Sequence, residues 1–166
     1  MSALATLEDW VLAADGAAIE IATSALASSQ VEHAAPEQEH EALFGAYVPL
    51  VAEGCRVQIG IVAEWEACKA VASALLGMEP ESESDVFDAL GEIANMTAGL
   101  VKTRMNERVP GLNTGLPLCV SGQVQRSAGV EQGGSTLFID QTRVNVRVLL
   151  SSHLPSSRDS ADRRRG

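Results

Sequence analysis

Two pairs of apolar segments, each joined by a tight turn, constrain the fold of this sequence more than any other feature. Residues 43–52 and 55–63 are separated only by an acidic residue and a glycine, which favours a two-residue β-hairpin turn. Residues 135–140 and 143–150 form the second pair, and the last segment mostly alternates apolar residues with arginine or asparagine. Strands joined by such turns are antiparallel. The pattern therefore predicts a largely antiparallel sheet with one face on a core.

Three other segments repeat their apolar residues at the period of an α-helix, namely residues 6–28, 64–76 and 84–107. Thr6 is a suitable N-cap for the first helix, and Gly77 directly follows the second. Helices and hairpins in this order predict a single α+β domain, in which three main helices pack on the sheet.

The remaining stretches are polar or contain proline. Residues 29–42 are expected to be a solvated connector, because their histidines and carboxylates fit no compact metal-ligand motif. Residues 115–126 are expected to form a further strand. We expect the domain to span residues 1–150 and residues 151–166 to form a disordered basic tail.

The distribution of charge indicates which partners the chain disfavours. The net charge is −10, made up of −15 over residues 1–100 and +5 over residues 101–166. Such an acidic body repels nucleic acid and anionic membranes, and it suits a partner with a positive patch. The sequence has no apolar run long enough to span a membrane and no basic N-terminal signal, which predicts a cytoplasmic protein. Its three cysteines form no C-x-x-C pair and are expected to be reduced thiols.

One face of the predicted helix 84–107 carries polar residues that fall close together at 100° per residue. They are Asp88, Glu92, Asn95, Gly99, Lys102 and Asn106. We call this face the polar ridge. Most helix faces of this kind are simply solvated. Asn95 and Gly99, however, are poor helix formers in mid-helix positions, and Glu92 lies one turn from Asn95. The polar ridge is therefore a candidate functional surface.

The sequence DALGEIANMTAG lies on this helix at residues 88–99. It resembles the signature helix of the chemotaxis phosphatases CheC, CheX and FliY. That family's pattern is an acidic or serine residue, a glutamate, an asparagine and a later proline, which Asp88, Glu92, Asn95 and Pro117 match. CheC and FliY usually carry two such helices. This chain has one, so it resembles the CheX branch.

The resemblance implies a CheC/CheX-like α+β fold and an enzyme that dephosphorylates the aspartyl phosphate of a CheY-type response regulator. It implies that Asn95 positions the attacking water and that Glu92 docks the regulator by contacting a lysine of its active site. Asp88, Gly99 and Lys102 are expected to bind the same partner, with Asp88 supporting docking or pairing with Lys102 outside the complex. No metal or cofactor of its own is implied, because the regulator carries the Mg²⁺.

A second function stays open from the residues alone. The same ridge could belong to a non-catalytic binding module for a response regulator or signalling scaffold. No motif of another enzyme class competes, since the sequence has no Walker A loop, no G-x-S-x-G and no H-E-x-x-H. A buried Asn95, bonded within its own domain, would favour a structural role for that residue.

The resemblance also implies a homodimer joined through the sheets of its subunits. The strand 143–150 is the expected contact, because its apolar face needs a core while Arg143 and Arg147 would limit unwanted edge pairing. The alternative is a monomer whose edge is protected by these arginines and by the polar tail.

Overall fold

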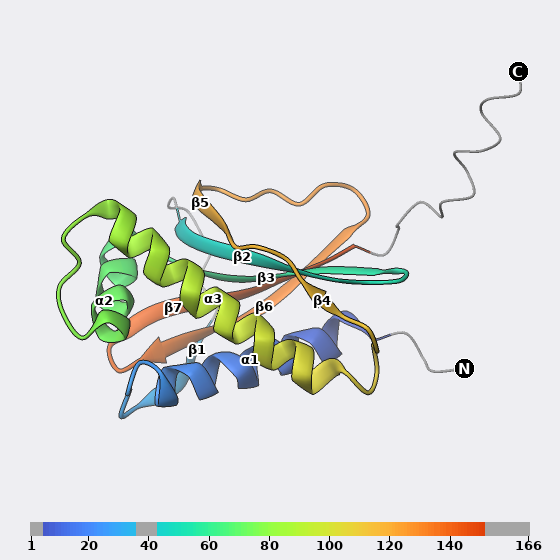
Figure 1. The fold of residues 1–166 in the computed structure, drawn as a ribbon, viewed down its shortest axis with the longest axis horizontal. Helices are drawn as coiled ribbons and strands as arrows, with labels where there is room; N and C mark the ends of the chain where they lie inside the picture. The colour runs from blue at the N-terminus through green and yellow to red at the C-terminus, as the bar shows by residue number, and fades with distance from the viewer. Residues whose placement is uncertain (1–4, 36–42, 152–166) are drawn as a thin grey trace, which may run out of the picture.

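The structure is a computed structural model that describes residues 5–35 and 43–151. Its helices are α1 (Leu7–Ser24), α2 (Trp65–Leu76) and α3 (Glu83–Met105). Its strands are β1 (Val31–Ala34), β2 (Leu43–Ala52), β3 (Cys55–Ala63), β4 (Asn113–Thr114), β5 (Leu118–Gly122), β6 (Val130–Ile139) and β7 (Thr142–Ser151). Figure 1 shows their arrangement in space.

The strands form one sheet in which every pair is antiparallel. The spatial order is β1-β6-β7-β3-β2, and β4 and β5 pair with different parts of the remaining edge of β2. β2 and β3 pair from Phe44↔Ala63 to Ala52↔Cys55, so their turn consists of two residues, as predicted. The expected single α+β domain with three helices and an antiparallel sheet is confirmed.

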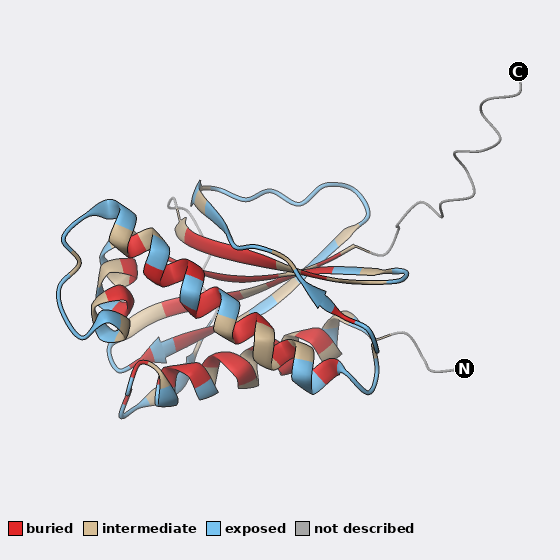
Figure 2. Cartoon of the chain, in the orientation of Figure 1, coloured by how far each residue is buried: buried red, intermediate tan, exposed pale blue. Residues whose placement is uncertain are grey.

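All three helices cover the same face of the sheet, and the core lies between the two layers (Figures 1 and 2). Val57, Ile59 and Ile61 of β3 point into this core and are at most 3% exposed. On the opposite face the Tyr47 ring lies over Gly60, where a Cβ would leave the ring no room. A glycine in β3 is therefore required by the close approach of the tyrosine.

Local capping groups set where the helices begin and end. Thr6 and Asp9 form a capping box at the start of α1, and Ser82 and Asp85 form another at the start of α3. Gly77 ends α2 in the left-handed conformation, with φ of 70°. Within the described residues, no helix combines the length and the apolar character that crossing a membrane requires.

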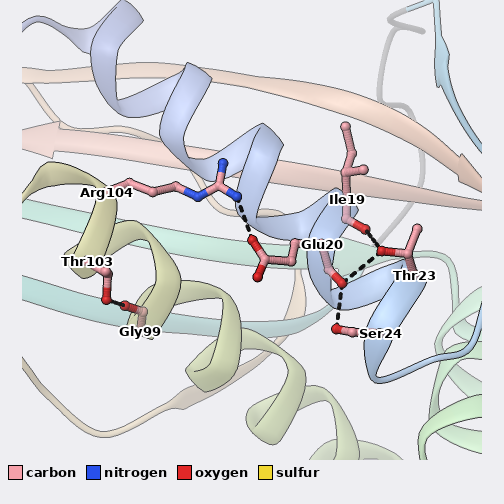
Figure 3. Close-up of polar contacts among 7 residues, drawn as sticks. All are labelled: Ile19, Glu20, Thr23, Ser24, Gly99, Thr103 and Arg104. Atoms are coloured by element: carbon pink, nitrogen blue, oxygen red, sulfur yellow. Dashed lines mark hydrogen bonds and ion pairs between the residues drawn. The ribbon is translucent and has the colours of Figure 1, made fainter.

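α1 and α3 lie side by side and run antiparallel. The Arg104 guanidinium of α3 donates to the Glu20 carboxylate of α1 at 2.7 Å (Figure 3). Nearer the start of α1, Asp9 pairs with Arg108. A Cβ on Gly16 would meet the Arg104 guanidinium, so this flexible side chain would have to shift to admit it.

Several boundaries differ from those predicted. The expected connector 29–42 contains β1, which pairs with β6, and its residues 36–42 lie outside the described part of the chain. The expected strand 115–126 is shorter and is preceded by β4 as a separate strand. Of the expected tail 151–166, the first residue belongs to β7, and the remainder lies outside the described residues.

The strand expected at a subunit contact is a central strand of the sheet. β7 pairs with β6 on one side and with β3 on the other, so the prediction that 143–150 joins two subunits edge to edge is wrong. Arg143 and Arg147 lie on the face away from the helices, and the Arg143 guanidinium is 5.4 Å from the centre of the Phe138 ring. The alternating pattern therefore reflects the two faces of a central strand.

Candidate functional site

α3 presents opposite faces to the core and to solvent, as its periodicity predicts. Val86, Leu90, Ile93 and Val101 are at most 4% exposed and pack in the core. Thr97 is also buried, and its hydroxyl donates to the Ile93 carbonyl at 2.8 Å. The buried face fixes the rotation of the helix and hence the direction in which the polar ridge points.

Asp88, Glu92 and Asn95 all lie on the exposed face of α3. None of their side chains makes a hydrogen bond or ion pair with a described residue. Glu92 and Asn95 are three residues apart and therefore neighbours on the helix surface. Asn95 is exposed and forms no hydrogen bond with a described residue, and it is a poorer helix former than alanine. A structural role for Asn95 is thereby disfavoured.

Gly99 forms a notch in the polar ridge. A Cβ placed on it would meet no atom within 4 Å, so the notch is open to solvent. The Gly99 carbonyl accepts a hydrogen bond from the Thr103 hydroxyl at 3.1 Å (Figure 3). The suggested pairing of Asp88 with Lys102 does not occur, because the two residues are separated by about 21 Å of helix axis.

Pro117 lies beside the ridge, although it follows α3 in another element. It belongs to the link between β4 and β5, and a Cβ on Gly91 of α3 would be 3.6 Å from the Pro117 Cβ. Its neighbours Leu116 and Leu118 are 87% and 66% exposed. The structure therefore brings Pro117 next to the helix that carries the other three residues of the family pattern.

A groove borders the other side of the ridge, and the sequence interpretation missed it. Its walls are the last turn of α2, the α2–α3 link and the first half of α3. Its lining residues are Leu75, Leu76, Met78, Glu79, Pro80, Glu81, Asp85, Asp88, Ala89 and Glu92. We call it the α2–α3 groove. The only sequence feature that points to the groove is the run of acidic residues before α3. The leucines at the end of α2 do not point to it, since in the sequence they resemble ordinary core residues.

The cysteines offer no activated nucleophile. Cys119 is exposed near the ridge, with its Sγ 3.7 Å from the Phe87 carbonyl oxygen. Burial, with a further contribution from the Asp88 carboxylate, raises the pKa of the Cys119 thiol. Burial raises the pKa of Cys68 to about 12. Both cysteines are therefore thiols near neutral pH.

The described residues contain no group of three or more His, Cys, Asp or Glu side chains that could hold a metal ion. Of the histidines in the segment 29–42, His33 contacts the Asp15 carboxylate at 2.8 Å, and His40 lies outside the described residues. The Asp15 carboxylate also accepts from the Ser135 hydroxyl at 2.6 Å. This cluster ties α1 to β1 and β6.

Solved structures that share this fold include proteins of bacterial chemotaxis. The chemotaxis protein CheX of Vibrio vulnificus superposes with a TM-score of 0.69 at 16% identity, over 86% of this chain and 96% of that chain. A chain of the CheX–CheY–BeF3–Mg²⁺ complex of Borrelia burgdorferi superposes with a TM-score of 0.66 at 17% identity, over 90% and 99%. The FliM middle domain of H. pylori gives a TM-score of 0.58 at 13% identity, over 89% and 94%. At these identities the likeness shows the fold.

Family membership comes from the sequence. No curated protein matches the chain. The family model described as "Chemotaxis phosphatase CheX" matches residues 44–138, which is more than half of the chain. The matched range includes Asp88, Glu92, Asn95 and Pro117. The chain therefore belongs to the CheX family of chemotaxis phosphatases.

Proposed function

We propose that this chain removes the phosphoryl group from the aspartyl phosphate of a CheY-type response regulator. The observation that carries the proposal is the pair Glu92 and Asn95, which project together from α3 into solvent without a partner among the described residues. Membership of the CheX family supports it. So does the similarity of fold to a chain solved in complex with CheY, BeF3 and Mg²⁺.

Asn95 is the residue assigned to the chemical step. Hydrolysis requires a water molecule in line with phosphorus, and it releases phosphate and the free aspartate of the regulator. The Asn95 amide oxygen can accept a hydrogen bond from that water, while its NH₂ group can donate to a phosphoryl oxygen. An acyl phosphate is intrinsically labile, so positioning alone supplies a useful part of the acceleration.

Glu92 is assigned to docking. Its carboxylate would accept a charge-assisted hydrogen bond from a lysine in the active site of the regulator. Asp88 would add negative charge on the same side, Gly99 would let the backbone of the regulator approach α3, and Lys102 would contact it further along the helix. The Mg²⁺ would be bound by the regulator and not by this chain.

The test is to phosphorylate purified CheY-type regulators, add the protein at catalytic concentration and follow the loss of phosphate. We expect faster loss with the wild type and a higher KM with Glu92→Lys, because a lysine would repel the lysine of the regulator. Wild-type protein that accelerates the loss from no regulator would refute the enzymatic assignment. A Glu92→Lys variant with wild-type KM would remove Glu92 from the contact.

The non-catalytic alternative is separated by the same experiment. A binding module would bind the phosphorylated regulator and leave its phosphate lifetime unchanged or longer. Exposure of Asn95 is compatible with both functions, but only catalysis requires an amide at this position.

We also propose that the chain forms a homodimer, although not by edge pairing of β7. Within the described residues, β1 forms one edge of the sheet and β4 with β5 forms the other. Either edge could pair with its equivalent in a second copy. Light scattering at micromolar concentration decides the question, since a mass near 17.4 kDa would contradict the dimer.

A further inference from the structure

The α2–α3 groove leaves two large apolar side chains in solvent. Leu76 is 46% exposed and Met78 is 59% exposed, whereas Val71 and Ala72 on the same helix are buried. Leu75 lines the groove beside them. Removing such apolar surface from water stabilises a complex, so the groove offers a favourable contact that the isolated domain does not make.

The link that forms one wall of the groove is held in place by hydrogen bonds. The Asp85 carboxylate accepts from the backbone N–H groups of Glu81 and Ser82 at 3.0 and 2.9 Å. The Ser73 hydroxyl donates to the Glu79 carboxylate at 3.3 Å. A wall fixed in this way presents a preformed surface, which lowers the entropic cost of binding.

The charge around the groove has one sign. Five carboxylates line it, and no lysine or arginine is among its lining residues. The nearest cation along α2, Lys69, pairs with Glu66 at 2.8 Å. A partner that buries an apolar side chain here must therefore present positive charges around it, because negative ones would be repelled.

We infer that the α2–α3 groove is a second part of the docking surface for the regulator, and that it receives an apolar side chain of the regulator flanked by lysine or arginine residues. Asp88 and Glu92 belong both to the groove and to the polar ridge, so the two form one continuous surface. The identity of the partner rests on the proposed function. In this arrangement the groove selects which regulator binds, while Asn95 acts on the phosphoryl group.

The test uses substitutions with matched controls. Leu76→Ala combined with Met78→Ala removes exposed apolar surface from the groove, and Leu12→Ala removes a leucine of α1 that is 64% exposed and lies outside the groove. Glu81→Lys reverses a charge at the groove, and Glu53→Lys makes the same change in the β2–β3 turn. All these side chains are exposed, so melting temperatures should stay close to that of the wild type.

Binding is measured with CheY-type receiver domains activated by Mg²⁺ and beryllofluoride, and turnover with the same domains phosphorylated. Both groove variants should raise the Kd at least about tenfold and raise KM with kcat unchanged. Both controls should stay within about twofold of the wild type.

The outcomes separate the inference from the proposed function. Suppose that the wild type dephosphorylates the regulator and that the groove variants bind it as tightly as the wild type does. The groove inference is then overturned, and the proposed function stands. If the groove substitutions weaken binding to a regulator that the wild type binds but does not dephosphorylate, the groove inference is supported and the proposed catalytic function is refuted. If the wild type binds no CheY-type receiver domain, both are overturned.

Discussion

Replacing Asn95 by alanine should separate catalysis from stability and from binding. The Asn95 side chain is exposed and contacts no polar group of the described residues, so its removal breaks no internal hydrogen bond. Alanine is the better helix former by about 0.5 kcal/mol in a helix interior. For a chain of this size that gain corresponds to an increase in melting temperature of about 1–2 °C.

The effect of this substitution on turnover should be large. Removing a single group that positions a reactant or stabilises developing charge costs about 100-fold or more in kcat, equivalent to roughly 2.7 kcal/mol. Binding of the phosphorylated regulator should change little, because Glu92 and the α2–α3 groove remain intact. We therefore expect Asn95→Ala to lower kcat about 100-fold at nearly constant KM.

The assay is quantitative loss of phosphate from the regulator under steady-state conditions, with thermal unfolding measured on the same samples. Asn106→Ala is the matched control, because Asn106 is an exposed asparagine of the same ridge and caps the C-terminal end of α3, about three turns from Asn95. It should keep wild-type kcat. An Asn95→Ala variant with wild-type kcat would refute the role of the amide, and one that unfolds at a clearly lower temperature would refute the claim that Asn95 is structurally dispensable.

Three further results are expected. Gly99→Ala should raise the free energy of unfolding by about 1 kcal/mol in denaturant titrations, because its Cβ meets no atom within 4 Å, and it should raise KM by filling the notch. A thiol reagent should modify exposed Cys119 first and Cys68 last, because burial raises the pKa of Cys68 to about 12. Mass spectrometry follows the order of modification, and the reverse order would contradict this expectation. Hydrogen bonds from Thr6 lower the pKa of the Asp9 carboxyl below 3.8 in the folded state. The ionised Asp9 therefore stabilises the folded state above pH 3.8, and this stabilisation is lost as the pH falls through the lower pKa of the folded protein. Asp9→Asn should therefore flatten the acid limb of the stability–pH curve.

Features encoded by neighbouring residues could be predicted from the sequence. The β2–β3 hairpin was predicted with its observed bounds, because the two-residue turn and the alternating strands are local signals. The rotation of α3, and with it the exposure of Glu92 and Asn95, follows from the spacing of its apolar residues. The family pattern assigned roles to these two residues, and the structure shows that both are accessible.

Features that depend on distant pairing could not be predicted. β1 is short and carries exposed polar residues, and it is held by β6 through pairs such as Val31↔Ile139. The central position of β7 depends on the order of the strands in the sheet, which the alternation of apolar and polar residues along one strand does not encode. Leu76 and Met78 look like core residues in the sequence, and only the packing of α2 against α3 leaves them in solvent to line the groove.

The central position of β7 has a consequence for how the chain folds. The β2–β3 hairpin closes over two residues and can form early, whereas β3 and β7 join residues almost ninety positions apart, as in Gly60↔Arg147. Until β7 has been synthesised, β3 has an open edge and the β1–β6 pair has no connection to the β2–β3 pair. A nascent chain that stops before Thr142 would therefore expose an unpaired apolar strand, which is the kind of edge that promotes aggregation.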